Sequence, residues 1–210
     1  MKGELRVHLL LESLQPQFAA YLGTPTRARG YPPFAGQHAL IIEVAPGLMI
    51  ERVIDLALKA DPDLEPGILF VERQFGILEI HGSDPSRIER ADQAILAGLG
   101  LRSDDQLVPK ILYTDVIEDI ADQHAVIINR NRQASMVLPG ETLLIVEMVP
   151  ALYAAIAANA AERVVPKLTL VDVQMIGAAG RLYMSGTTAD VKLGLAEIVR
   201  VLASIKGRDG

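Results

Sequence analysis

The residues best suited to metal binding or acid–base chemistry in this 210-residue chain are its histidines, His8, His38, His81 and His124. They lie far apart, and no two have the short spacing by which one helix or turn presents two ligands to an ion. His124 falls on the apolar side of an expected helix, so we expect a packed or interface position rather than a ligand or base. The chain has no cysteine, which excludes thiol catalysis, disulfides and cysteine-bound zinc or iron–sulfur clusters.

The usual sequence signatures of catalysis and nucleotide binding are also missing. There is no glycine-rich loop ending in Lys-Ser or Lys-Thr, and there is no Gly-x-Ser-x-Gly turn. Glu43 and Glu147 occupy equivalent strand ends, and a catalytic acid would not need to be duplicated. We therefore expect them to have a structural role, such as pairing with a helix N-terminus. We expect that the protein is not an enzyme and has no cofactor. A rival hypothesis is an enzyme with its active site between the first and second halves of the chain, because catalytic groups can converge from distant positions.

Charge and composition exclude further classes of protein. The 26 acidic side chains outnumber the 20 Lys and Arg, for a net charge of −6, which opposes sequence-independent nucleic-acid binding. Aromatic residues make up 4% of the chain, so little is available for stacking on bases. The uncharged stretch Met148–Ala161, which no other in the chain exceeds in length, contains Pro150 and Asn159 and is shorter than the roughly 20 apolar residues of a membrane span. We expect a soluble protein with a large aliphatic core.

The chain contains an internal duplication. Leu40–Pro46 can be aligned with Leu144–Pro150, so that Glu43 matches Glu147 and Pro46 matches Pro150. Further matches follow in the same order and at nearly constant spacing, which chance similarity would not maintain. We expect two domains, 1–105 and 106–210, each about 100 residues long, which is a common domain size.

Both copies predict the same succession of elements: strand, helix, Pro- and Gly-rich loop, strand, helix, β-hairpin and final helix. The expected strands are 5–10, 39–44, 68–71 and 77–81 in the first copy, and 110–114, 142–149, 168–173 and 182–185 in the second. Asp84-Pro85 predicts the start of one final helix, and Thr187 or Thr188 the start of the other.

The helix after the first strand is predicted from apolar residues at helical spacing. These residues are Leu11, Leu14, Phe18 and Leu22 in the first copy, and Ile117, Ile120, His124 and Ile128 in the second. Helices on one face of a mainly antiparallel sheet would give an α+β sandwich.

Several of these segments resemble the bacterial microcompartment shell domain. They are Val146-Glu147-Met148 before an alanine-rich helix, the loop Ile176–Gly180, the strand Leu182–Gly186 and a final helix. The strand and helix of 110–130 would come last in the standard domain but come first here, in both copies, as in circularly permuted tandem shell proteins. The segment Val71–Gly76, VERQFG, resembles the pore motif of the gated subgroup found in carboxysomes and related organelles.

The resemblance implies an α+β fold of two tandem, circularly permuted, ferredoxin-like-derived domains, with helices packed on antiparallel sheets. Three chains would close a homotrimeric, pseudohexameric tile in the shell of a microcompartment in the bacterial cytoplasm. Two trimers can stack face to face in the gated subgroup, and other hexameric and pentameric shell proteins would surround the tile. Small metabolites would cross a central pore, and no cofactor, metal, nucleic acid or membrane is implied.

The resemblance also assigns roles to individual residues. Glu72 and Arg73 would be the pore gate. The residues expected to line the pore are Gln74, Phe75, Gly76, Gly177, Ala178, Ala179 and Gly180. Lys59 and Arg163 align with the tile-edge lysine of single-domain shell proteins, although Arg163 departs from lysine. For Phe75 a core or interface position is an equal alternative. The second loop could line a second narrow aperture or bind an anion through its backbone, and a flexible turn explains it at least as well.

A threefold axis would turn one Glu-Arg pair into a ring of three acids and three bases. Like charges 4 Å apart repel by about 1 kcal/mol even in water, so a closed pore would alternate Glu72 and Arg73 across chain boundaries. An open pore would turn them outward, and a ligand that prefers one arrangement would bias the gate. The alternatives are a solvated hairpin tip, whose exposed ion pairs contribute little, and a trimeric α+β regulatory protein that binds a small molecule between subunits.

Overall fold

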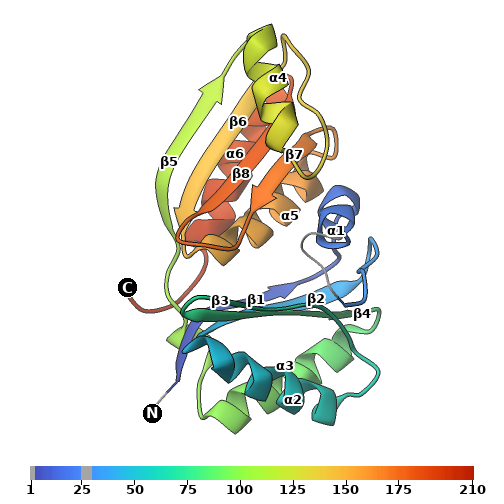
Figure 1. The fold of residues 1–210 in the computed structure, drawn as a ribbon, viewed down its shortest axis with the longest axis vertical. Helices are drawn as coiled ribbons and strands as arrows, with labels where there is room; N and C mark the ends of the chain where they lie inside the picture. The colour runs from blue at the N-terminus through green and yellow to red at the C-terminus, as the bar shows by residue number, and fades with distance from the viewer. Residues whose placement is uncertain (1–2, 25–29) are drawn as a thin grey trace. The chain divides into compact units, whose positions relative to one another are not determined.

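The computed structural model of the chain describes residues 3–24 and 30–210, and for Glu72 the backbone only. The chain divides into two compact units (Figure 1). The first unit comprises the residues up to Val108 together with Lys206–Gly210, and the second comprises Pro109–Ile205. No helix among the described residues has the length and apolarity needed to cross a bilayer.

The first unit is a four-stranded antiparallel sheet with its helices in the order that the repeat predicts. Its elements are β1 (Glu4–Leu11), α1 (Pro16–Leu22), β2 (His38–Ala45), the 3-10 turn η1 (Gly47–Met49), α2 (Ile50–Ala60), β3 (Glu65–Glu72), β4 (Phe75–Gly82), α3 (Pro85–Leu99) and η2 (Ser103–Asp105). The strand order is β1-β2-β4-β3, so β3 and β4 form a hairpin at one edge.

The second unit repeats this topology. Its elements are β5 (Lys110–Ile117), α4 (Asp122–Asn131), β6 (Thr142–Val149), η3 (Ala151–Tyr153), α5 (Ala154–Val164), β7 (Thr169–Gln174), β8 (Gly180–Gly186) and α6 (Thr188–Ala203). The strand order β5-β6-β8-β7 matches that of the first sheet. The predicted α+β class, the antiparallel sheets and both hairpins are therefore confirmed.

One face of each sheet is covered by the two longest helices of its unit (Figure 1). In the first unit, Leu40, Ile42 and Val44 of β2 pack with apolar residues of α2 and α3 to form the core. Strand side chains alternate between the two faces of a sheet, so the residues between them point away from this core. In the second unit, α4 packs on the opposite face of the sheet from α5 and α6, where Ala125 joins Leu143 and Val171 in a smaller cluster.

The helix after the first strand is shorter than predicted in both copies. Leu11 ends β1 and Leu14 lies in a loop, where its carbonyl accepts a hydrogen bond from Gly36 N at 2.8 Å. Likewise, Ile117 ends β5, and the carbonyl of Ile120 accepts a hydrogen bond from Gly140 N at 3.0 Å. The predicted helix start was wrong in each copy because buried loop residues continue the helical spacing of apolar residues. The backbone groups of these loop residues form hydrogen bonds with the next loop and not within a helix.

The predicted starts of the two final helices are confirmed. The Asp84 side chain accepts a hydrogen bond from Ser86 N, and Pro85 occupies the first turn of α3. In α6 the capping residue is Thr187, whose hydroxyl accepts a hydrogen bond from Asp190 N at 3.2 Å. Such caps satisfy amide groups that have no partner within the helix.

Candidate functional site

The expected gate lies on the turn between β3 and β4. Arg73 and Gln74 form the turn, and the backbone pair Glu72–Phe75 closes it. Arg73 has a φ of 50°, in the left-handed region that costs an L-residue about 1–2 kcal/mol. Both turn residues are exposed. Glu72 ends β3 through its backbone, and its side chain lies outside the described part of the chain.

The base of this hairpin is held by direct contact between backbones. Gly76 is buried, and a Cβ built on it would lie only 2.1 Å from the carbonyl oxygen of Gly47. Gly180 is its counterpart in the second unit, where a Cβ would lie 2.2 Å from the carbonyl oxygen of Ala151. Both glycines were expected to line a pore, but each lies against the 3-10 turn that precedes a helix, with no room for a side chain.

A buried carboxylate lies below the first hairpin. The Nε of Arg6 donates a hydrogen bond to Oε1 of Glu43 at 2.8 Å, and the Arg6 guanidinium carbon lies 3.8 Å from the centroid of the Phe75 ring. The Glu43 side chain is 2% exposed and that of Arg6 is 19% exposed. Burial raises the pKa of Glu43, although the hydrogen bond and the charge of Arg6 act in the opposite direction. Glu43 thus has the structural role that we predicted, but its partner is an arginine and not a helix N-terminus.

The second loop, between β7 and β8, is longer, and its last three residues, Gly177, Ala178 and Ala179, are small. Gly177 has a φ of 128° with open space around it, and Ala178 is exposed, whereas Gly177 and Ala179 are partly exposed. Glu147, the counterpart of Glu43, accepts a hydrogen bond at 2.9 Å from Nε of Arg181 on β8. This second pair is solvent-exposed, with 49% of the Arg181 side chain and 32% of the Glu147 side chain accessible.

The two expected tile-edge residues occupy equivalent places in their units. Lys59 lies in the last turn of α2, where it pairs with Asp55 at 2.7 Å, and its side chain is 73% exposed. Arg163 lies in the last turn of α5 and is exposed. Both side chains are accessible to a neighbouring molecule.

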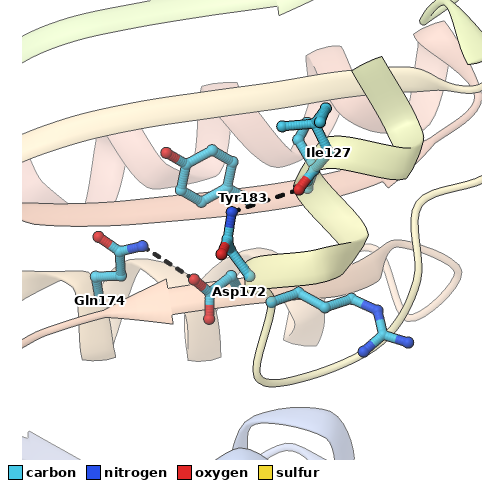
Figure 2. A pocket seen from close by; sticks show the side chains of 7 residues that line it. Ile127, Asp172, Gln174 and Tyr183 are labelled. Atoms are coloured by element: carbon cyan, nitrogen blue, oxygen red, sulfur yellow. Dashed lines mark hydrogen bonds between the residues drawn. The ribbon is translucent and has the colours of Figure 1, made fainter. Parts of the chain in front are cut away.

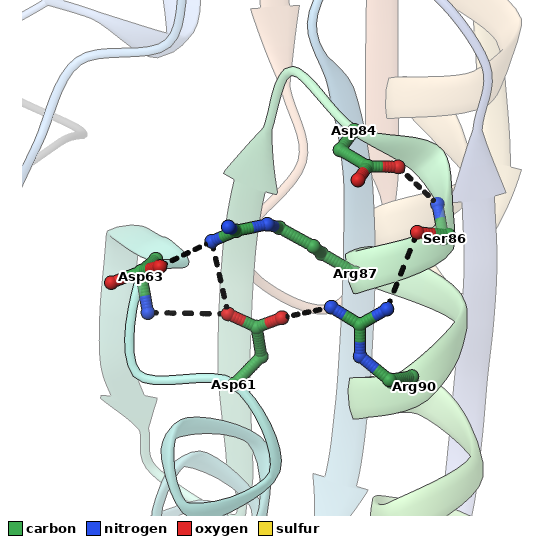
Figure 3. A network of polar contacts seen from close by, with 6 residues as sticks. All are labelled: Asp61, Asp63, Asp84, Ser86, Arg87 and Arg90. Carbon is green, nitrogen blue, oxygen red and sulfur yellow. Dashed lines mark hydrogen bonds and ion pairs between the residues drawn. The ribbon is translucent and has the colours of Figure 1, made fainter.

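An ion-pair network joins the end of α2 to the start of α3 (Figure 3). The buried carboxylate of Asp61 accepts hydrogen bonds from Arg90 at 2.5 Å and Arg87 at 3.4 Å, and from Asp63 N at 3.2 Å. Burial by itself would raise the pKa of Asp61, but the hydrogen bonds and positive charges hold it below its usual value. The arginines and the backbone occupy the acceptor oxygens of Asp61, so the network serves to position α2 and α3.

Two buried histidines are hydrogen-bonded to acidic side chains, and sequence analysis did not predict either pair. Nε2 of His8 lies 2.5 Å from Oδ1 of Asp92, a residue distant in sequence. His81 and Glu79 are both fully buried, and Nδ1 of His81 lies 2.9 Å from Oε1 of Glu79. The two residues are two positions apart on one strand, and this spacing was the only sequence feature that could have indicated the pair. His124 is exposed on α4, so the packed alternative is wrong for the single chain. Among the described residues no cluster of acids and histidines could hold a metal ion.

The second unit has a cavity of about 330 Å³ between α4 and strands β7 and β8 (Figure 2). Its lining residues are Ile127, Ile128, Asn131, Arg132, Asp172, Gln174 and Tyr183. The buried carboxylate of Asp172 accepts hydrogen bonds from Gln174 Nε2 at 3.1 Å and from Gln133 N at 3.3 Å. These bonds satisfy the carboxylate within the chain itself.

Comparisons with known proteins agree with this architecture. The model of the family described as "CsoS1D N-terminal domain" matches residues 5–105. The carboxysome shell protein CcmP of Synechococcus elongatus is 40% identical over 209 residues, which cover 100% of this chain and 96% of CcmP. The chain belongs to the tandem-domain shell proteins of bacterial microcompartments. Another relative is the carboxysome shell protein CsoS1D of Prochlorococcus marinus, which is 40% identical over 96% of this chain and 78% of its own length.

Two solved structures resemble this shell protein over nearly its whole length. The double-ringed trimeric shell protein MSM0271 of the RMM microcompartment is 61% identical, with a TM-score of 0.95 over 99% of this chain and 100% of that one. The fused permuted hexameric shell protein MSM0275 of the same microcompartment is 47% identical, with a TM-score of 0.92 over 98% and 100% of the two chains. The predicted family and the predicted permuted tandem fold are both confirmed.

Proposed function

We propose that this protein is a non-enzymatic structural tile of a bacterial microcompartment shell. Three chains form a pseudohexameric ring, and two such rings stack. The observation that carries the proposal is the presence of two units with one topology in a chain 61% identical to a double-ringed trimeric shell protein. Two similar units per chain and three chains per ring place six similar units around one axis, which is the geometry of a hexagonal tile.

The proposed pore is bounded by the two kinds of loop. Gly76 and Gly180 hold equivalent positions at the loop bases, so a threefold ring brings three hairpin turns and three glycine-rich loops to similar distances from its axis. Glu72 and Arg73 form the gate by alternating their charges across chain boundaries. The accessible tip residues Gln74 and Ala178 line the opening.

The remaining lining residues fall into two groups. Gly177 and Ala179 are partly exposed residues on either side of Ala178, and Phe75, also partly exposed, follows the first turn. Gly76 and Gly180 act as rigid supports for the two loops, because their backbones contact the helix starts. Small metabolites are the cargo of the pore.

The tile edge is proposed to include Lys59 and Arg163, whose exposed side chains occupy equivalent positions. They would contact other hexameric and pentameric shell proteins. Identity is 61% to the RMM microcompartment protein and 40% to the carboxysome proteins, which favours a compartment of the former kind.

Native mass spectrometry combined with electron microscopy tests the proposal. We expect particles of three or six times the 22.7 kDa chain mass, and sheets, tubes or stacked discs at high protein concentration. A monomer would refute the tile. A trimer that never forms such assemblies and binds a small molecule between its subunits would support the regulatory-protein hypothesis instead.

A further inference from the structure

The Arg6 side chain lies at a break in the regularity of β1. The pairing of β1 with β2 shifts between Leu5 and Val7, leaving Arg6 as the additional residue of a β-bulge. Bulges redirect a side chain relative to its neighbours in the strand. This one directs Arg6 to two groups, the buried carboxylate of Glu43 and the ring of Phe75.

The two contacts of Arg6 reinforce each other. A guanidinium that stacks on an aromatic ring while donating to a carboxylate uses both its flat face and its edge, which lysine cannot reproduce. The carboxylate is fixed because Glu43 lies in the middle of the sheet, opposite Val7 on β1 and Ile77 on β4. Arg6 therefore connects an immobile part of the unit to the first residue after the hairpin turn.

The part of the hairpin that this contact can control is short. Gly76 packs directly against the carbonyl oxygen of Gly47 in the 3-10 turn, and this contact restrains the base of the hairpin. The segment free to change conformation is thus 72–75, which contains the proposed gate. Phe75 is the residue of this segment that Arg6 contacts. The contact with the Phe75 ring therefore fixes the position of the first residue of β4, next to the turn.

The second unit lacks this arrangement although it has the same bulge. The pairing of β5 with β6 shifts between Ile111 and Tyr113, and the bulged residue is Leu112, which is 50% exposed. The acid Glu147 is paired with Arg181 from another strand. The stacked arginine is therefore specific to the unit that carries the charged hairpin turn.

We infer that Arg6, anchored by Glu43, is a positioning residue for the gate: its contact with Phe75 holds the tip 72–75 in the conformation described here, and the gate moves when that contact breaks. This inference rests on the proposed gate function of the tip. It concerns residues within one unit, however, so the contact can be tested whether or not three chains surround a pore.

Hydrogen exchange of the assembled protein, read by mass spectrometry at residues 72–76, tests the inference. Arg6→Ala and Phe75→Leu should each raise the exchange rate there about tenfold, equivalent to about 1.4 kcal/mol of lost local stability, without changing exchange in β5 and β6. The double variant should exchange no faster than either single variant, since both remove the same contact. Glu43→Gln should give a smaller increase, because it removes the charge but keeps an acceptor.

The matched control is Arg181→Ala, which removes the corresponding ion pair of the second unit and should leave exchange at 72–76 unchanged. Rates within twofold of wild type in both Arg6→Ala and Phe75→Leu would overturn the inference, as would independent effects that multiply in the double variant. Native mass spectrometry of the same samples reports on the trimer separately, so a failure of the tile proposal is recognised by a different measurement.

Discussion

The contact between each hairpin base and its helix start can be tested by adding a single methyl group. In Gly76→Ala the new Cβ would lie 2.1 Å from the Gly47 carbonyl oxygen and 2.6 Å from Ile50 Cβ. Ordinary contacts begin near 3.4 Å, so the strand and the turn must separate by more than an ångström. Both obstacles belong to the backbone or lie next to it, so no side-chain rotation relieves the overlap.

The expected cost follows from the size of this overlap. Overpacking of a well-packed core costs about 1–3 kcal/mol, and a clash with backbone belongs at the upper end of that range. For a chain of this length each kcal/mol lowers Tm by about 2–4 °C, so a loss of about 3 kcal/mol predicts a decrease of about 6–12 °C. Gly180→Ala should behave alike, because its Cβ would lie 2.2 Å from the Ala151 carbonyl oxygen.

Differential scanning calorimetry at one fixed protein concentration measures the effect, since oligomer stability depends on concentration. Gly186→Ala is the matched control: its Cβ would meet the flexible end of the Leu168 side chain at 3.3 Å and Asp190 Cβ at an ordinary 3.9 Å, and its Tm should stay within about 2 °C of wild type. The reasoning is refuted if Gly76→Ala and Gly180→Ala melt within the same narrow interval as this control.

Four other predictions concern the gate, two buried carboxylates and a helix cap. Replacing Glu72 and Arg73 together by Ala should leave trimers intact in native mass spectrometry but abolish distinct open and closed pores among imaged particles; unchanged open and closed forms would contradict the gate. Burial raises the pKa of Glu79, against the opposing effect of His81, so wild-type unfolding free energy should fall as pH rises from 4.5 through that raised value. Urea titrations of Glu79→Gln should lack this fall, and an identical pH profile would contradict the assignment. Burial alone would raise the pKa of Asp61, but Arg90 and its other partners lower it. The stabilising effect of Asp61 should therefore be present above pH 3.8 and disappear as pH falls through the lowered pKa. Acid titration of Asp61→Asn should show a weaker loss of stability than wild type, and equal losses would argue against the network. Thr187→Ala should lower the unfolding free energy by about 1 kcal/mol through the lost cap of α6, measured against Thr187→Ser, which keeps the capping hydroxyl, and equal values for the two variants would show that the cap does not contribute.

Local patterns in the sequence predicted most of the secondary structure. The strand Thr142–Val149 was predicted with its exact bounds, and the caps at Asp84 and Thr187 were among the predicted ones. The predicted start of the first helix in each copy was wrong because apolar periodicity reports burial and not hydrogen bonding. Leu14 and Ile120 are both buried, yet their carbonyl oxygens accept hydrogen bonds from loop glycines.

The candidate site was predictable only in part. The charged turn and the glycine-rich loop are each made of consecutive residues, so a sequence motif could indicate each of them. The packing role of Gly76 and Gly180 had no comparable signal, since it depends on how closely a strand approaches the turn before the helix. The same holds for His8 and Asp92, whose pairing depends on the packing of α3 against the sheet.

The sequence by itself determined that the chain is a duplicated α+β protein with two hairpins, because a repeat and a strand pattern are written in consecutive residues. Only the tertiary structure decided that Arg6, at a bulge, lies between Glu43 and Phe75. A bulge changes the direction of one side chain without leaving a pattern in the sequence, and the partners it meets are set by strand register across the sheet.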